Sequence, residues 1–347
     1  MSQVLYRKYR PQTFDEVEGQ EHVVQTLKGA VGSGRIGHAY LFAGPRGTGK
    51  TTMARLLAKA LNCAKDGQLI CNKCSNCSSV NENRFMDLIE IDAASNRGID
   101  EIRNIKDSAQ VASSHGGYKI FIIDEVHMLT PQAFNALLKV LEEPPSHVVF
   151  ILATTEPHKV IDTILSRVQR FDFRKLTDSQ IASKINRVAK KENIVIDSNS
   201  VSQIVWASEG SLRDAENALA KLVVFTEGKI TSDLSSQILG IVPSQTNKEF
   251  LEFLFKKDTK SAIKLVGDIY ESGLDLENFV SQFLLYLRRQ LLESFNVPPG
   301  EGFEPAFLAS AIRAFIKTKT ELKTSPLPQL PIELAVWEIT QAGNKSV

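Results

Sequence analysis

Residues 38–62 read "HAYLFAGPRGTGKTTMARLLAKALN", a short apolar run, a glycine-rich turn and a helix-like segment in direct succession. The apolar run predicts a buried strand, and the apolar spacing of 51–62 predicts a helix. The turn "GPRGTGKT" (44–51) fits the pattern G-x-x-x-x-G-K-[ST], whose glycines let successive backbone N–H groups point at phosphate oxygens. Because the N-terminus of the following helix adds a positive dipole, the stretch predicts a nucleotide phosphate site.

The side chains of this turn have distinct expected parts in the phosphate site. We expect Lys50 to reach the β- and γ-phosphates and Thr51 to be a ligand of Mg²⁺. The residues expected to contact the nucleotide are Gly44, Pro45, Arg46, Gly47, Thr48, Gly49, Lys50, Thr51 and Thr52.

A second apolar run, "IFIIDEVH" (120–127), predicts a strand that brings two carboxylates to the same edge of the sheet. We expect Asp124 to hold the Mg²⁺, usually through water, and Glu125 to polarise the water that attacks the γ-phosphate. Alone, the two acids could also be charges at a helix N-terminus. Together with the phosphate loop they indicate a nucleotide hydrolase.

A third run, "LATTEP" (152–157), ends in two neighbouring hydroxyls, Thr154 and Thr155. One of them could hydrogen-bond the γ-phosphate or the attacking water. The pair could equally reflect the preference of threonine for strands. The residues alone leave both interpretations open.

The arrangement of runs along the chain predicts an α/β core followed by helical parts. Strands are expected at 38–44, 87–92, 119–124 and 147–154, with helices at 98–112 and 131–143 between them. This alternation is typical of a parallel sheet with both faces covered. Thr130 and Pro131 are expected to start the second helix, and the prolines of "EEPPSH" to end it.

Beyond about residue 175 the sequence predicts helices without strands between them, and 238–246 resembles a linker. We therefore expect three parts: a core over 1–175, a small helical lid over 176–240 and a helical domain over 241–347.

Composition narrows the class of protein. The 347 residues contain 41 Lys and Arg against 40 Asp and Glu, so a basic coat for wrapping nucleic acid is not expected. The basic N-terminus lacks the apolar segment of a secretory signal, and no apolar run approaches the ~18 residues of a membrane span. These features favour a soluble, intracellular chain without a membrane partner.

All four cysteines lie within 61–77, "LNCAKDGQLICNKCSNC", at Cys63, Cys71, Cys74 and Cys77. Two-residue spacers and one distant fourth thiol are typical of a closed structural zinc site. Disulfides are disfavoured, since the short loops would be strained and the compartment is reducing. A redox dithiol would not need the third and fourth cysteine. We expect a zinc knuckle at 63–77 inserted in the core.

Several stretches occur in the order found in one known family. They are "YRKYRPQTFDEVEGQ", "GPRGTGKTT", "CNKCSNC", "IIDEVHMLTPQAFNALLKVLEEPP", "LATTEPHKV", "ILSRVQRFDF" and "EGSLRDAENAL". The chain resembles the AAA+ clamp loaders, and most closely the gamma/tau family of bacterial DNA polymerase III subunits, densely over about residues 4–240. The resemblance implies an ATPase core with a zinc module, a helical lid and a C-terminal collar.

The resemblance also implies roles for residues outside the three runs. Arg213 in "GSLRDA" corresponds to the lid arginine that reaches the γ-phosphate, and Thr154 or Thr155 to the strand-end sensor. Arg10, Pro11 and Val17 correspond to positions that flank the adenine base.

Arg167 in "LSRVQRF" corresponds to an arginine that completes the site of a neighbouring subunit. The family's Ser-Arg-Cys reads Ser166-Arg167-Val168 here, so the cysteine is replaced while serine and arginine remain. In related loaders a helix at the position of 97–106 tracks template phosphates, which implies Arg97, Arg103 and Lys106 as DNA contacts. Those three could equally belong to a solvated helix face.

The implied function is ATP-driven opening and loading of the β sliding clamp onto primer-template DNA. Implied partners are the delta and delta-prime subunits and further copies of the chain in a five-subunit ring, within the cytoplasmic, nucleoid-associated replisome. The polymerase active site is expected elsewhere in the holoenzyme. Helicase- and polymerase-binding domains carried by longer relatives are not expected in this chain.

Two alternatives remain. "DEVH" and "ATT" also occur in DExH-type helicases, which need a second α/β domain. A non-hydrolysing subunit of the delta-prime kind shares the cysteine module and the Ser-Arg motif but loses the phosphate loop. The intact Lys50, Thr51, Asp124 and Glu125 favour the ATPase.

Overall fold

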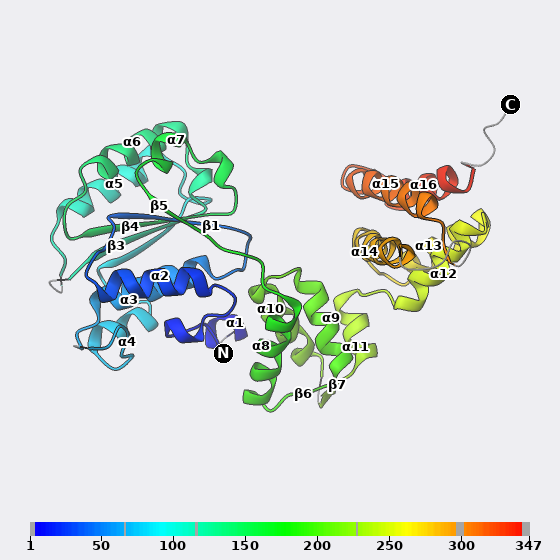
Figure 1. The fold of residues 1–347 in the computed structure, drawn as a ribbon, viewed down its shortest axis with the longest axis horizontal. Coiled ribbons are helices and arrows are strands. Elements are labelled where there is room, and N and C mark those ends of the chain that lie inside the picture. Colours follow the sequence, from blue (N-terminus) through cyan, green and yellow to red (C-terminus); the bar gives the residue numbers. More distant parts are fainter. Residues whose placement is uncertain (1–3, 66, 115–116, 227, 296–301, 342–347) are drawn as a thin grey trace. The chain divides into compact units, whose positions relative to one another are not determined.

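The computed structural model describes residues 4–65, 67–114, 117–226, 228–295 and 302–341 (Figure 1). The chain divides into two compact units. The first consists of Met1–Ile194 with Ile204–Lys221, and the second of Val195–Gln203 with Leu222–Val347. The division into 1–175, 176–240 and 241–347 remains a prediction. The boundaries of the two compact units differ from it, since two of them fall inside helices α9 (Ser198–Ser208) and α10 (Leu212–Val224).

The first unit is built on a five-stranded parallel sheet with strand order β2-β3-β4-β1-β5. The strands are β1 Ala39–Ala43, β2 Leu88–Asp92, β3 Lys119–Asp124, β4 Val148–Thr154 and β5 Gln169–Asp172. The four strands expected from the sequence are present, and the parallel α/β core is confirmed. The fifth, at the edge beside β1, had not been expected because its side chains are mostly exposed.

Alternate side chains of the central strands pack into two separate apolar layers, one on each face of the sheet. Phe121 and Ile123 of β3 pack in one layer, and Ile120 and Ile122 pack in the other. Figure 1 shows α5 (Ile99–Gln110), α6 (Pro131–Glu142) and α7 (Asp162–Leu165) over one face of the sheet and α2 (Glu21–Gly32) and α3 (Lys50–Asn62) over the other. Burying such a side chain contributes roughly 1.5–3 kcal/mol, so both helical layers hold the sheet edge in place.

Seven α-helices and three short 3₁₀ turns surround this sheet in the described part of the chain. The helices are α1 Leu5–Lys8, α2 Glu21–Gly32, α3 Lys50–Asn62, α4 Ser75–Asn81, α5 Ile99–Gln110, α6 Pro131–Glu142 and α7 Asp162–Leu165. Short 3₁₀ turns occupy Phe14–Glu16, Val126–Met128 and Pro157–Lys159. The expected start of α6 is confirmed, since the Thr130 side chain accepts a hydrogen bond of 3.3 Å from the Ala133 N–H.

The segment after the sheet is mainly helical. It contains α8 Asp178–Lys191, α9 Ser198–Ser208, α10 Leu212–Val224 and α11 Ser232–Leu239. The prediction of no strands here was wrong in one detail, because β6 Val195–Ile196 and β7 Lys229–Ile230 form a parallel pair. Two residues are too few to show a strand period in the sequence.

The remaining helices form an aromatic core in the second unit. They are α12 Ser244–Phe255, α13 Thr259–Glu271, α14 Leu276–Ser294, α15 Pro305–Leu322 and α16 Leu330–Gln341. Phe283 is fully buried, with ring centroids 4.8 Å from Phe250 and 4.9 Å from Phe315. The helical domain expected over 241–347 includes 296–301 and 342–347, which lie outside the described residues.

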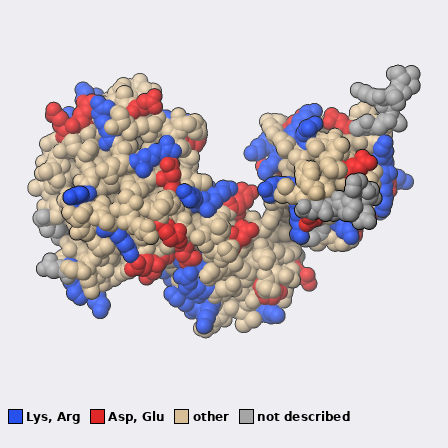
Figure 2. All heavy atoms as spheres, in the orientation of Figure 1, with Lys and Arg blue, Asp and Glu red and all other residues tan. Residues whose placement is uncertain are grey.

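The surface carries both signs of charge. On the face drawn in Figure 2, Lys and Arg side chains are interspersed with Asp and Glu. The formal net charge is +1, in agreement with this mixture. Among the residues that the structure describes, no helix has both the length and the apolar character needed to cross a membrane.

Candidate nucleotide-binding site and cysteine cluster

The glycine-rich turn between β1 and α3 has the backbone conformation that only glycine adopts easily. Gly44, Gly47 and Gly49 have φ angles of +148°, +73° and +100°. Gly47 also lacks room for a side chain, because a Cβ there would lie 1.9 Å from Ser211 Oγ. The curled turn therefore needs glycine both for its conformation and for the close approach of the segment before α10.

Lys50 is held inside this turn at the start of α3. Its side chain is buried, and Nζ donates to the carbonyl oxygens of Gly44 at 2.7 Å and Pro45 at 2.9 Å. Burial lowers the pKa of this ammonium, while Glu125 and Asp124 act in the opposite direction. The turn thus fixes a cation where a phosphate would be cradled.

The ends of α3 and β3 meet directly at this site. Thr51 Oγ1 donates to Asp124 Oδ2 at 2.9 Å, and the Glu125 N–H donates to Asp124 Oδ1 at 3.0 Å. Glu125 has a left-handed φ of +48°, which turns the chain sharply after the strand. A hydroxyl and two carboxylates, all oxygen ligands, therefore lie beside Lys50, and this donor set suits Mg²⁺.

The two threonines at the end of β4 have different surroundings. Thr155 donates from Oγ1 to Glu125 Oε2 at 3.0 Å. Thr154 is fully buried, its Oγ1 lies 3.0 Å from His127 Nδ1, and it accepts from the Glu156 N–H at 3.0 Å. Thr155 contacts the strand-end carboxylate, whereas Thr154 braces the turn after β4.

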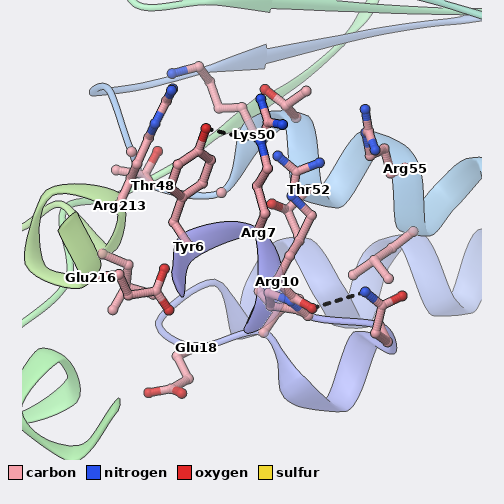
Figure 3. Close-up of a pocket in the computed structure, with 18 of the residues that line it drawn as sticks. Tyr6, Arg7, Arg10, Glu18, Thr48, Lys50, Thr52, Arg55, Arg213 and Glu216 are labelled. Carbon is pink, nitrogen blue, oxygen red and sulfur yellow. Dashed lines mark hydrogen bonds between the residues drawn. The ribbon is translucent and has the colours of Figure 1, made fainter. Parts of the chain in front are cut away.

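A cavity of about 470 Å³ opens over the glycine-rich turn (Figure 3). This volume is in the range of small-molecule sites. Most of the site residues predicted from the sequence line it: Arg10, Pro11, Val17, Arg46, Gly47, Thr48, Gly49, Lys50, Thr51, Thr52, Asp124, Glu125 and Arg213. Gly44 and Pro45 of the turn and Thr154 and Thr155 at the end of β4 are not part of the lining.

Sequence reasoning missed an aromatic residue in the cavity. Figure 3 shows Tyr6 of α1 between Arg213 of α10 and Arg7. The Arg213 guanidinium carbon lies 4.9 Å from the centroid of the Tyr6 ring, and Arg7 Nε donates to the Tyr6 hydroxyl at 3.2 Å. The hydrogen bond from Arg7 lowers the pKa of the Tyr6 phenol. Arg213 is thus held by a cation–π contact.

A buried ion pair lines the same cavity and was also missed. Lys184 Nζ lies 3.7 Å from Glu216 Oε1 and donates to the Tyr9 carbonyl at 3.0 Å. Burial raises the pKa of Glu216 to about 7, although Lys184 opposes the change. No spacing pattern signals this pair, because its partners lie on α8 and α10.

The other predicted residues lie outside the cavity lining. Arg167 precedes β5 and pairs with Glu142 Oε1 at 2.9 Å. Arg97 just before α5 and Arg103 and Lys106 along it are exposed, with Arg103 paired to Asp100 at 2.9 Å. The structure brings none of these four to the phosphate turn.

The four cysteines converge in space and fit a metal. All four Sγ atoms lie within 4.8 Å of one another, with Cys71 and Cys77 4.0 Å apart. A tetrahedral shell with Zn–S bonds of about 2.3 Å separates its sulfurs by about 3.8 Å. The backbone N–H groups of Lys73 and Cys74 donate to Cys71 Sγ at 3.4 and 3.3 Å.

The surroundings of these thiols change their pKa values in opposite directions. The two N–H donors lower the pKa of Cys71 to about 6, while burial raises the pKa of Cys77 to about 12. Sulfurs this close repel one another as thiolates, and a divalent cation removes that repulsion. All four are free of disulfides. The cluster is consistent with the expected zinc knuckle.

Comparison with solved structures shows the fold. Thermotoga maritima RuvB, a Holliday junction branch migration motor, matches with a TM-score of 0.51 and 20% identity. The match covers 71% of this chain and 79% of that one. The expected AAA+ fold is therefore confirmed. A family model described as DNA polymerase III, delta subunit, matches residues 19–177.

Several curated relatives are more similar to this chain in sequence than RuvB is. DNA polymerase III subunit tau of Bacillus subtilis is 38% identical over 99% of this chain, and that of Escherichia coli is 39% identical over 91%. The chain spans 64% and 49% of those two proteins. Subunit gamma of Buchnera aphidicola is 40% identical, and the match covers 82% of this chain and 78% of that protein. The chain belongs to the gamma/tau family of DNA polymerase III subunits.

Proposed function

We propose that this chain is an ATPase subunit of a bacterial DNA polymerase III clamp loader. ATP binding and hydrolysis would open the β sliding clamp and load it onto primer-template DNA. The observation that carries the proposal is the hydrogen bond of 2.9 Å between Thr51 and Asp124. It places a hydroxyl and a carboxylate of two separate motifs at one point, beside Lys50 and Glu125, in a cavity of suitable size.

The glycine-rich turn would bind the nucleotide's phosphates. Its backbone N–H groups and the α3 N-terminus provide donors, and Lys50 would exchange its two carbonyl partners for phosphate oxygens. Mg²⁺, when bound, neutralises phosphate charge, and Thr51 and Asp124 are the residues that would hold it. Arg10, Pro11 and Val17 line the cavity and would flank the adenine base.

Hydrolysis needs a group that orients water, and Glu125 is the carboxylate available for it. We assign the strand-end sensor to Thr155, because its hydroxyl contacts Glu125 while Thr154 is occupied in bracing the turn. Arg213 would leave the face of Tyr6 to contact the γ-phosphate.

Arg167 would act on the nucleotide of a neighbouring subunit. It is outside the cavity lining, and about a third of its side chain is exposed, so a partner's phosphates could reach it. A trans arginine makes hydrolysis depend on assembly. The partners would be the delta and delta-prime subunits and further copies of the chain in a five-subunit ring, with the collar over 241–347 as the assembly domain.

DNA contact would use the exposed cations just before and along α5, namely Arg97, Arg103 and Lys106. Contact with phosphates alone suits a machine that loads clamps at any sequence. The working location would be the cytoplasmic replisome at the nucleoid. The cysteine cluster would hold a structural Zn²⁺, remote from the hydrolysis chemistry.

A structural, non-hydrolysing subunit is the second candidate, because the matching family model is described as a delta subunit. The intact Lys50, Asp124 and Glu125 favour the ATPase. A DExH-type helicase fits poorly. After residue 175 the described part of the chain has only the two-residue strands β6 and β7, too few for a second α/β domain.

The deciding experiment measures ATP turnover by the chain reconstituted with its sister subunits, clamp and primed DNA. The wild type should hydrolyse ATP. Glu125→Gln should keep its affinity for a fluorescent ATP analogue and lose about 10²–10⁴-fold in turnover, as for removal of a general base. Lys50→Ala should abolish nucleotide binding, and Glu143→Gln, at an exposed carboxylate, is the matched control.

A wild-type complex that is complete but inert would establish the structural subunit instead. Unchanged nucleotide affinity in Lys50→Ala would refute the assignment of the phosphate site.

A further inference from the structure

A buried lysine joins the cavity to the cysteine loop. Lys59 of α3 is only 2% exposed. Its Nζ donates to the Gln12 carbonyl at 2.8 Å, to Gln12 Oε1 at 3.2 Å and to Asn81 Oδ1 at 2.7 Å. It also donates to Asn72 Oδ1 in the cysteine loop. One ammonium on α3 thus joins the N-terminal segment at Gln12 to the stretch 72–81, about 60 residues further along the chain.

Further hydrogen bonds tie the same segments to each other. Asn72 Nδ2 donates to the Gln12 carbonyl at 3.2 Å, and Gln12 Nε2 donates to the Arg10 carbonyl at 3.2 Å. Arg10, Gln12 and Lys59 all line the cavity. Asn72 lies directly after Cys71, so a continuous chain of contacts runs from a cysteine to the cavity wall.

Because Lys59 is buried, its ammonium depends on these hydrogen-bond partners. An ammonium has three protons and no acceptor, and burying it is costly unless its protons are satisfied. All its partners here are neutral oxygens, so their positions determine how well the charge is stabilised. Displacing either Asn72 or Gln12 removes a partner from Lys59, and the other segments must adjust.

We propose that Lys59 is a positioning residue that couples metal occupancy of the cysteine cluster to nucleotide binding in the cavity. The inference rests on the proposed nucleotide site. A metal on Cys63, Cys71, Cys74 and Cys77 fixes the loop that carries Asn72. Through Lys59 the loop fixes Gln12 and the Arg10 backbone in the position that receives the nucleotide. By linkage, bound nucleotide stabilises the metal-bound loop by the same factor.

The test measures the release of Zn²⁺ from the full chain to a pyridylazo chelator, which binds Zn²⁺ well and Mg²⁺ poorly. Release is followed with and without a non-hydrolysable ATP analogue, and binding of a fluorescent ATP analogue is measured in the same samples. We expect the nucleotide to slow release roughly tenfold, within the usual range of coupling between sites. Zinc-depleted chain should bind nucleotide more weakly, by the factor with which nucleotide raises the equilibrium affinity for Zn²⁺.

Two variants separate coupling from folding. Lys59→Met should remove the effect of nucleotide on release. Asn72→Gly should also remove the effect of nucleotide on release, and it should disturb the fold less than Lys59→Met. Asn72 has a left-handed φ of +54°, which glycine adopts without strain. Lys73→Met is the matched control, since it removes an exposed lysine from the same loop and should leave the coupling intact.

The outcomes are distinct. Equal release rates with and without bound nucleotide in the wild type would overturn the inference, and so would full coupling retained in Asn72→Gly. Loss of coupling in Lys73→Met would overturn the specific role of Lys59, since any nearby charge would then suffice. Failure of the wild type to bind nucleotide would instead refute the proposed function, and this inference with it.

Discussion

Glu216 should make the stability of the first unit depend on pH. Its pKa is raised from 4.5 in the unfolded chain to about 7 in the folded one, chiefly by burial. The folded state therefore prefers the protonated carboxyl. The resulting stabilisation is fully present below pH 4.5 and is lost as the pH rises through about 7.

The size of the effect follows from the shift. The difference between about 7 and 4.5 is roughly 2.5 pKa units, which corresponds to about 3 kcal/mol in the free energy of unfolding. Glu216→Gln keeps the shape of the protonated side chain but cannot ionise. The variant should be more stable than the wild type by about 1 kcal/mol at pH 5 and by about 3 kcal/mol at pH 8.

Tryptophan fluorescence can report this unit alone. The chain has two tryptophans, Trp206 in the first unit and Trp337 in the second, where it is exposed. In a Trp337→Phe background, urea unfolding followed through Trp206 at pH 5 and pH 8 measures the difference. Glu143→Gln, at an exposed carboxylate, should give the same result at both pH values.

The reasoning is refuted if the difference between Glu216→Gln and the wild type does not grow with pH. A variant less stable than the wild type at pH 8 would show that attraction to Lys184 at 3.7 Å outweighs the cost of burying the carboxylate.

Three further predictions concern separate parts of the chain. Phe283→Ala should lower the free energy of unfolding of the second unit by about 3–5 kcal/mol, because a fully buried ring is replaced by a cavity. Urea unfolding followed through Trp337 measures the change, and a much smaller loss would contradict the burial. Gly47→Ala should weaken binding of a fluorescent ATP analogue about tenfold, since φ is +73° and the new Cβ would meet Ser211; unaltered affinity would contradict the geometry. Arg167→Ala should leave ATP binding near normal and lower turnover in the assembled ring about 10³-fold. A defect confined to the isolated chain would argue against a role in trans.

The central sheet and the phosphate turn could be predicted because their signals are local. Strands β1, β3 and β4 are buried on both faces and read as continuous apolar runs. The turn at 44–51 carries its chemistry in eight consecutive residues. Convergence of Thr51 and Asp124 followed from the rule that parallel strands end at one edge.

The edge strand and the packing partners could not be predicted so directly. Gln169, Arg170 and Asp172 give β5 a polar sequence because only one of its sides faces a neighbouring strand. Lys59 would be expected on the solvated face of a helix. Its burial depends on amide side chains that fold back from 12, 72 and 81, and spacing along one helix does not reveal them.

The alternation of side chains along β3 also limits where the chain can gain or lose a residue. Because successive residues enter opposite layers, loss of a single codon between Ile120 and Ile123 would send the later side chains of this strand to the opposite face of the sheet. Both apolar layers would then receive the wrong residues, and Asp124 would be carried away from Thr51. The number of residues in β3 thus fixes which side chains face the α5–α6 layer and where Asp124 lies beside the phosphate turn, so we expect insertions and deletions to be tolerated only in the flanking loops.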